Sequence, residues 1–281
     1  MSQFLSISPK LHVSSSDEPP VTAASQNGEA PLELRQVPIE QIHLDSGSRV
    51  VVHSDPRGLA ADRFRFLRLR LRERAATGKL KTILVTSPLP EDGKSTVAVN
   101  LATTLAERGK RNVLLLEADL YHATISENLG IPVRPGLAEC LEGGLDPASA
   151  LRRLDPLGWY LLPGGAPDGN PTELLQSDRL SAVMAKLSQH FDWIIIDSPP
   201  VAAVSDALSL ARTADATLLV VRAGHTPKQA VTEACTLIGP KHIIGIILNG
   251  VEGLNRVYSK YYGRYGEPAS TASNGRSDAA K

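Results

Sequence analysis

The residues best suited to chemistry form one short run, residues 87–96, with the sequence Ser-Pro-Leu-Pro-Glu-Asp-Gly-Lys-Ser-Thr. It lies between an apolar run at 82–86 and a helical pattern at 97–108. Gly93, Lys94 and Ser95 match the phosphate-binding pattern G-x-x-x-x-G-K-[ST], although Pro88 replaces its first glycine. Backbone N–H groups at a helix start bind phosphate oxygens, the lysine contacts the β- and γ-phosphates, and the serine hydroxyl binds Mg²⁺. A turn followed by a helix cap is the alternative, but the flanking strand and helix favour a P-loop.

Three carboxylates follow apolar runs that are predicted to be strands of the same sheet. Glu117 and Asp119 come after the run at 112–116, and Asp197 ends the run Trp-Ile-Ile-Ile-Asp before two prolines. Such residues are otherwise common in turns and helix caps. Their expected convergence beside the P-loop favours Asp197 as the acid that holds Mg²⁺ through water. Glu117 or Asp119 would accept a proton from an incoming hydroxyl.

The elements that position these residues alternate between strand and helix. Continuous apolar runs at 82–86, 112–117, 159–162, 193–197, 217–221 and 243–248 predict buried strands. Helical patterns at 97–108, 137–141, 175–187 and 228–237 lie between them. This order predicts an α/β fold of the P-loop NTPase type, with a mostly parallel sheet covered by helices on both faces. Ligands are expected at the carboxyl ends of its strands.

Composition limits the classes of protein to consider. The 281 residues include 30 Lys or Arg and 30 Asp or Glu, so the net charge of zero gives no reason to expect nucleic-acid binding. Cys140 and Cys235 lie in apolar contexts, which predicts buried thiols in a reducing compartment. No run is apolar enough to span a membrane, which predicts a cytosolic chain. We expect a disordered arm at 1–45, a P-loop domain at 46–256 and a flexible tail at 257–281.

Two further stretches are unusual. Residues 57–74 contain seven arginines, and Phe64, Leu67 and Leu71 follow a helical stripe, so the stretch is predicted to be a helix whose basic face is either solvated or a contact surface. Four of the six tyrosines cluster near the carboxyl end. Such a cluster could pack on a partner as an aromatic patch, but beside a P-loop domain it is also a candidate phosphate acceptor. The four residues are Tyr258, Tyr261, Tyr262 and Tyr265.

Six segments together carry a resemblance to one family. They are Pro-Glu-Asp-Gly-Lys-Ser-Thr at 90–96, Leu-Leu-Leu-Glu-Ala-Asp-Leu at 114–120, Pro-Gly-Leu-Ala-Glu-Cys-Leu-Glu-Gly at 135–143, Asn-Pro-Thr-Glu-Leu-Leu at 170–175, Phe-Asp-Trp-Ile-Ile-Ile-Asp-Ser-Pro-Pro at 191–200 and Ile-Leu-Asn-Gly-Val at 247–251. From about residue 54 to 265, the chain resembles the bacterial tyrosine kinases of capsular and exopolysaccharide synthesis, of the cytosolic autokinase type.

The resemblance implies ATP and Mg²⁺ as ligands and autophosphorylation of the tyrosine cluster in trans. It implies catalytic roles for Lys94, Glu117, Asp119 and Asp197, and metal binding by Ser95, Asp119 and Asp197. The nucleotide would be bound by Asp92, Gly93, Lys94, Ser95, Thr96 and Asn249. Asp62, Arg65 and Arg68 match the family's E-x-x-R-x-x-R ring-contact motif, with Asp for Glu.

The same resemblance implies several partners. An activating membrane polysaccharide co-polymerase would hold the kinase at the inner face of the cell membrane, and a cognate phosphotyrosine phosphatase would reverse the modification. The subunits would form a homo-oligomeric ring.

The chain departs from the family pattern near the predicted chemistry. Glu117 stands where the family usually has Asp, and Leu-Tyr-His-Ala at 120–123 replaces Leu-Arg-Arg-Pro. These changes leave open a weakly active enzyme or a pseudokinase. A nucleotide-switched scaffold resembling the partitioning ATPases is the alternative function. Those switches carry an extra lysine where this chain has Leu89, and they lack a tyrosine cluster, so a kinase is favoured.

Overall fold

The apolar runs form the centre of a sheet. A computed structural model describes residues 33–44 and 47–251. In this described part, eight strands lie in the order β1-β4-β5-β3-β6-β2-β7-β8, and every neighbouring pair is parallel except β4 and β5. The strands are β1 (Ile39–Gln41), β2 (Thr82–Thr86), β3 (Val113–Glu117), β4 (Arg152–Asp155), β5 (Trp159–Leu162), β6 (Trp193–Asp197), β7 (Ala216–Arg222) and β8 (Ile243–Asn249). The predicted mostly parallel sheet is confirmed.

The three central strands β3, β6 and β2 explain why the sequence runs are apolar without alternation. Every residue in them is buried, as expected for a strand covered on both faces. Their register places Glu117 opposite Asp197, and Asp197 opposite Val85 of β2. Because the strands are parallel, the P-loop after β2 and the carboxylates of β3 and β6 lie at the same edge.

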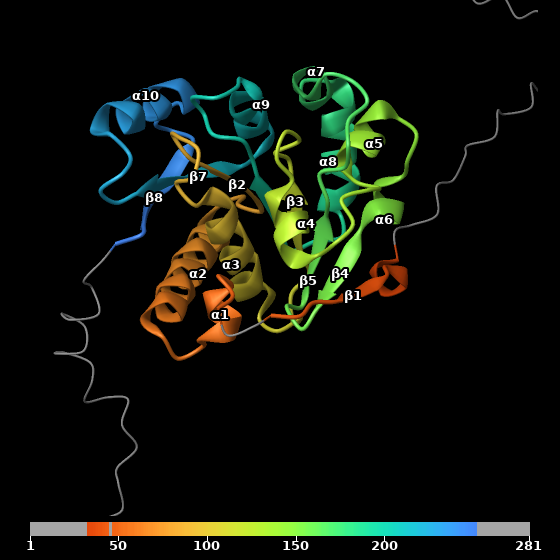
Figure 1. Ribbon diagram of the computed structural model, residues 1–281, viewed down its shortest axis with the longest axis horizontal. Coiled ribbons are helices and arrows are strands. Elements are labelled where there is room, and N and C mark those ends of the chain that lie inside the picture. The colour runs from red at the N-terminus through yellow and green to blue at the C-terminus, as the bar shows by residue number, and fades with distance from the viewer. Residues whose placement is uncertain (1–32, 45–46, 252–281) are drawn as a thin grey trace, which may run out of the picture. The chain divides into compact units, whose positions relative to one another are not determined.

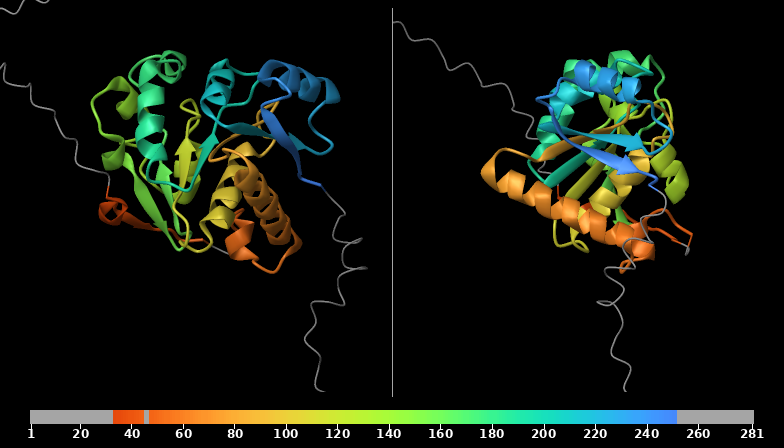
Figure 2. Two further views of the ribbon diagram at one scale, coloured as in Figure 1. Left: turned by 180° about the vertical axis from the view of Figure 1, so that it is seen from behind. Right: turned by 90° about the vertical axis from the view of Figure 1, so that its left-hand side faces the viewer.

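Helices cover both faces of this sheet (Figures 1 and 2). On one face α2 and α3 lie against each other, and Leu71, Leu101 and Leu105 join the core formed with Ile83 and Ile195. The helices α8, α9 and α10 cover the opposite face. The α-helices of the described part are α1 (Val51–Ser54), α2 (Leu59–Thr77), α3 (Lys94–Ala106), α4 (Thr124–Leu129), α5 (Leu137–Glu142), α6 (Pro147–Ala150), α7 (Pro171–Leu175), α8 (Asp178–Ser188), α9 (Asp206–Thr213) and α10 (Lys228–Ile238).

The arginine-rich stretch is a helix, as predicted. Phe64 and Leu67 of α2 pack on the core with buried Leu71, while Phe66 and Leu69 are 61% and 53% exposed. Among the described residues, no helix is long and apolar enough to cross a membrane.

Some expectations need correction. The compact unit begins at Glu33, not near residue 46, and residues 33–44 contain a 3-10 helix (Leu34–Gln36) and strand β1, which pairs with β4. The prediction of a disordered arm is therefore wrong for these residues, because a short edge strand gains its stability from a partner that a sequence pattern does not reveal. The helix expected at 175–187 is two helices, α7 and α8.

The predicted burial is confirmed for one of the two thiols and not for the other. Cys140 is buried, and burial raises its pKa to about 12, whereas Cys235 is half-buried. Residues 1–32 of the predicted arm and the tail with its four tyrosines lie outside the described residues.

Candidate active site

The P-loop turns into α3 at a glycine that no other residue could replace without strain. Gly93 has a φ of 92°, in the left-handed region, and a Cβ added there would lie 2.1 Å from Nδ2 of Asn249. That amide nitrogen donates to the backbone carbonyl of Asp92 at 3.0 Å. Asn249 therefore reaches across from the end of β8 and fixes the loop at the start of α3.

Asp92 holds the rest of the loop. Its side chain is fully buried and accepts hydrogen bonds from the backbone N–H of Leu89 at 3.1 Å and from the hydroxyl of Thr226 at 2.6 Å. Thr226, in the loop after β7, accepts in turn from the backbone N–H of Arg222 at 2.9 Å. Asp92 thus stabilises the P-loop from inside. The side chains of Lys94 and Ser95 are directed to the carboxyl ends of the strands.

Lys94 lies among carboxylates. Its Nζ is 3.0 Å from Oδ2 of Asp119 and 3.2 Å from Oγ of Ser95. The Ser95 hydroxyl donates to Oδ2 of Asp197 at 2.7 Å. The structure therefore brings together four predicted site residues: Lys94, Ser95, Asp119 and Asp197.

Burial and charge perturb the titration of this cluster. Burial raises the pKa of Asp197 to about 7, against the opposing effects of Lys94 and of the Ser95 hydroxyl. Burial alone would lower the pKa of Lys94, but Asp197 and Asp119 raise it by more, so the ammonium stays charged. Groups perturbed in this way by burial and a specific partner are typical of functional sites.

Glu117 does not join the cluster through its hydrogen bonds. Its carboxylate is completely buried and accepts from the backbone N–H groups of Ile125 at 2.7 Å, Ser126 at 3.2 Å and Gly164 at 3.2 Å, and also from the Ser126 hydroxyl. Burial raises its pKa in spite of these donors. Asp119 and Asp197 thus contact Lys94 and Ser95 directly. Glu117 lies near enough for its charge to raise the pKa of Lys94 and of Asp197, but its own hydrogen bonds connect the start of α4 to β3.

The residues present fit a magnesium nucleotide. Oδ1 of Asp197 is buried and has no hydrogen-bond partner among the described residues, so it can accept from a metal-bound water. No group of three or more His, Cys, Asp or Glu in the described part is arranged to hold a metal ion by itself. Mg²⁺ is usually bound by one or two carboxylates together with substrate phosphates. Ser95, Asp119 and Asp197 would supply the protein ligands.

A pocket of about 370 Å³ lies beside Asn249 and is a candidate site for the base of such a nucleotide. It lies between α2, α3 and β8, and its lining is largely apolar, with Phe64, Leu67, Val97 and Ile247 among its residues. Small-ligand sites commonly combine apolar walls with a few polar groups, and the Asn249 amide is one such group here.

The remaining predicted residues have local roles. Thr96 lies in the first turn of α3. Arg65 of α2 forms an ion pair with Asp62 and donates to the Pro56 carbonyl, and Arg68 donates to the Thr104 carbonyl at 3.2 Å. These contacts are within one chain, so the ring contact of Asp62, Arg65 and Arg68 stays a prediction.

The sequence analysis did not identify two residues that lie at or near the site. Thr226 braces Asp92, and Asp206, at the start of α9, is buried with both carboxylate oxygens unpartnered among the described residues. Burial raises the pKa of Asp206 against the opposing effect of the Thr172 hydroxyl, and the charge of Asp119 also raises it. The Asp of Val-Ser-Asp-Ala at 204–207 carries no general motif, but a lone acid after the two prolines of 199–200 was a signal.

Comparison with known proteins places this fold in the P-loop NTPase class. The family model described as "Cellulose biosynthesis protein BcsQ" matches residues 91–236. The tyrosine-protein kinase YwqD of Bacillus subtilis is 30% identical over 216 residues, which cover 76% of this chain and 91% of that protein. The succinoglycan biosynthesis transport protein ExoP of Rhizobium meliloti is 31% identical over 235 residues, covering 76% of this chain but only 30% of ExoP.

A solved structure agrees with these relatives. The kinase domain of the Escherichia coli tyrosine kinase ETK superposes with a TM-score of 0.69 at 29% identity, covering 74% of this chain and 82% of that domain. The chain belongs to the family of bacterial tyrosine-protein kinases.

Proposed function

We propose that this chain is an ATP- and Mg²⁺-dependent protein-tyrosine kinase that phosphorylates its own cluster Tyr258, Tyr261, Tyr262 and Tyr265 in trans. The observation that carries the proposal is the buried cluster of Lys94, Ser95, Asp119 and Asp197 at the start of a braced P-loop. Membership in the kinase family and the ETK likeness favour a kinase over a partitioning-type switch.

Each side chain of the cluster has a role that follows from its surroundings. The Lys94 ammonium, kept charged by two carboxylates, stabilises negative charge on the transferred phosphoryl group. Ser95, Asp119 and Asp197 would hold Mg²⁺, and the bound ion would neutralise phosphate charge. Asp119 is the carboxylate placed to receive the phenolic proton, because the hydrogen bonds of Glu117 are all directed to α4 and Gly164.

In the proposed transfer, each bond that breaks is matched by a bond that forms. The bond between the γ-phosphorus and the β–γ bridging oxygen breaks, and a bond between that phosphorus and the phenolic oxygen forms. The phenolic proton passes to the carboxylate of Asp119. The products are ADP and a phosphotyrosine, and no oxidant or reductant is needed.

The names of two matches support a biological setting for the proposed kinase. Polysaccharide synthesis appears in the names of ExoP and of the matching family model. We therefore extend the proposal to regulation of exopolysaccharide or capsule polymerisation and export. It includes a membrane co-polymerase as activator, a peripheral location at the inner face of the membrane through that partner, a ring of subunits and a cognate phosphatase.

The test is Lys94→Ala in the full chain, produced in a host without other tyrosine kinases. Loss of the ammonium should lower tail phosphotyrosine, measured by mass spectrometry, by about 100- to 1,000-fold. Lys110→Ala, at an exposed lysine outside the site, is the control and should match the wild type. Equal phosphotyrosine in the Lys94 and Lys110 variants would exclude the kinase. ATP turnover without any phosphotyrosine would instead support the nucleotide switch.

A further inference from the structure

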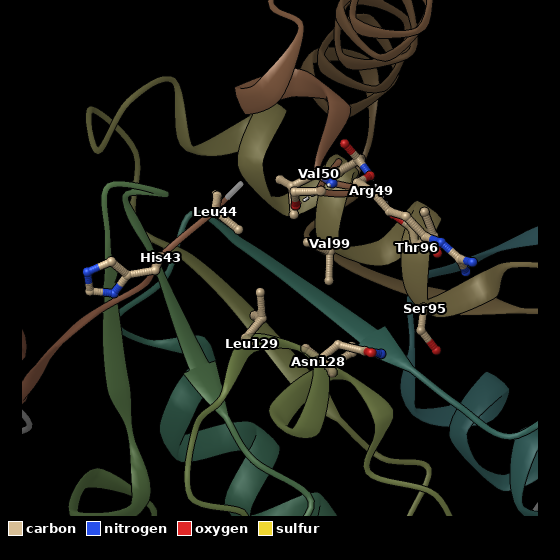
Figure 3. A pocket seen from close by; sticks show the side chains of 12 residues that line it. His43, Leu44, Arg49, Val50, Ser95, Thr96, Val99, Asn128 and Leu129 are labelled. Atoms are coloured by element: carbon tan, nitrogen blue, oxygen red, sulfur yellow. Dashed lines mark hydrogen bonds between the residues drawn. The ribbon is translucent and has the colours of Figure 1, made fainter. Parts of the chain in front are cut away.

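A second pocket lies on the opposite side of α3 from the pocket at Asn249. Its volume is about 440 Å³, within the usual range of small-ligand sites. It lies between α3, α4 and the segment that precedes α1 (Figure 3). Its lining residues are His43, Leu44, Ser48, Arg49, Val50, Ser95, Thr96, Val99, Asn100, Ile125, Asn128 and Leu129.

The pocket has an apolar middle and a polar end. Leu44, Val99 and Leu129 face one another across it (Figure 3). At the end next to the P-loop, the Arg49 side chain extends toward Thr96 and the Asn128 amide points toward Ser95. Among the described residues, no acidic side chain lines the pocket. An aromatic ring with a polar substituent can contact the apolar middle and the polar end of this pocket together.

The polar end adjoins the reacting groups. Ser95 lines the pocket, and its hydroxyl is 2.7 Å from Asp197 and 3.2 Å from the Lys94 ammonium. A hydroxyl held at this end is therefore one side chain away from the groups that bind the phosphates and Mg²⁺. An acceptor oxygen has to lie close to the transferred phosphoryl group, and this end of the pocket is next to the residues proposed to bind that group.

Arg49 adds a feature that suits the product. Its side chain is exposed, and its guanidinium forms no ion pair with any residue of the described part. A phosphotyrosine carries a charge of about −1.5 to −2 and three acceptor oxygens. A guanidinium binds such a group through two parallel hydrogen bonds.

We propose that this pocket binds the aromatic ring of the acceptor tyrosine, and that Arg49 holds the phosphate on that ring after transfer. The inference rests on the proposed kinase function and adds the subsite at which the acceptor is recognised. Leu44, Val99 and Leu129 contact the ring, and the hydroxyl points to Ser95. Asn128 borders the polar end and limits the space available to the ring.

The first experiment changes the space in the pocket. In the full chain, the four tail tyrosines are replaced by Phe, and a synthetic peptide of residues 256–267 is added as the acceptor. Asn128→Trp places an indole at the pocket end and should raise the peptide KM at least 10-fold. It should leave the Kd for a fluorescent ADP within 2-fold, because the base pocket is on the other side of α3.

Two control variants separate occlusion from other effects. Asn128→Ala loses the same hydrogen bond to the Thr124 carbonyl but keeps the pocket open, so its peptide KM should rise much less than that of Asn128→Trp. Glu127→Trp places the indole on the neighbouring exposed residue, which does not line the pocket. Equal peptide KM values for parent, Asn128→Trp and Glu127→Trp would overturn the proposal, as would an ADP affinity that falls with the peptide affinity.

The second experiment does not depend on catalysis. The phosphorylated form of the same peptide is titrated into the parent protein, Arg49→Ala and Arg57→Ala, the last at an exposed arginine outside the lining. We expect at least 10-fold weaker binding for Arg49→Ala alone. Equal affinities in all three proteins would refute the product site. If the parent protein binds ATP and Mg²⁺ but never phosphorylates the peptide, the kinase function is refuted instead. The titration with the phosphorylated peptide then decides by itself whether the pocket binds phosphotyrosine.

Discussion

Replacing Asp197 with Asn should change how the stability of the protein depends on pH. The folded protein raises the pKa of this carboxyl from 3.8 to about 7 because it is buried. The folded state therefore holds the proton more tightly than the unfolded state does. The cost to folding is absent below about pH 4, grows as the pH rises through the interval up to 7, and is complete above 7. Over the whole interval it is on the order of 4 kcal/mol.

The assay is urea unfolding from pH 5 to 8, without nucleotide and with a chelator present. The quantity to follow is the difference in the free energy of unfolding between Asp197→Asn and the wild type, which cancels the titration of other groups. This difference should move by roughly 3 kcal/mol in favour of the variant between pH 5 and 8. The variant's new amide group has no partner where Oδ1 lay, at a cost of about 1 to 3 kcal/mol, so the variant should be more stable only at the alkaline end.

Asp168→Asn, at a side chain 85% exposed, is the matched control for loss of a carboxylate. If the curves for Asp197→Asn and wild type run parallel from pH 5 to 8, the burial argument is refuted. The variant should also lose Mg²⁺-dependent turnover, which shows that a residue can lower stability and still be required.

Two further predictions follow from the braces around the site. Glu117→Gln should lower the free energy of unfolding by about 2 kcal/mol, because the new amide NH₂ would face the N–H donors of Ile125, Ser126 or Gly164. Urea unfolding measures this change, with Glu127→Gln at an exposed residue as the control. Equal stability of the two variants would contradict the prediction. Thr226→Val should weaken nucleotide binding about 10-fold, because buried Asp92 loses its hydroxyl donor, whereas Thr226→Ser should keep the wild-type affinity. The Kd is measured by titration with fluorescent ADP. Equal Kd values for the Val and Ser variants would show that this hydrogen bond does not support nucleotide binding.

The sequence predicted the centre of the fold better than its edges. The strands at 82–86 and 193–197 match β2 and β6 residue for residue, because buried parallel strands need unbroken apolar runs. Strand β1, with the sequence Ile-Glu-Gln, is too short and polar to give such a pattern, and it forms because β4 offers hydrogen bonds. Its existence depends on a partner more than 100 residues away along the chain.

The site likewise contains residues that the sequence predicts and residues that only the folded structure reveals. Lys94, Ser95 and Asp197 were predictable because their motif and strand ends define where they lie. The direction of Glu117 was not, because it is set by N–H groups of Ser126 and Gly164 that come from separate loops. Thr226 belongs to no motif, and only the folded structure brings it to Asp92.

The link between Asp92 and Asn249 also bears on the order in which the protein folds. The two residues are 157 positions apart, so the P-loop gains one of its fixing hydrogen bonds only when β8 has joined the sheet. Contacts between such distant positions carry a large chain-closure cost and tend to form late. A partly folded chain would thus have its phosphate-binding residues but not the conformation that uses them. Nucleotide would act as a late clamp, stabilising only molecules in which the last strand is already docked.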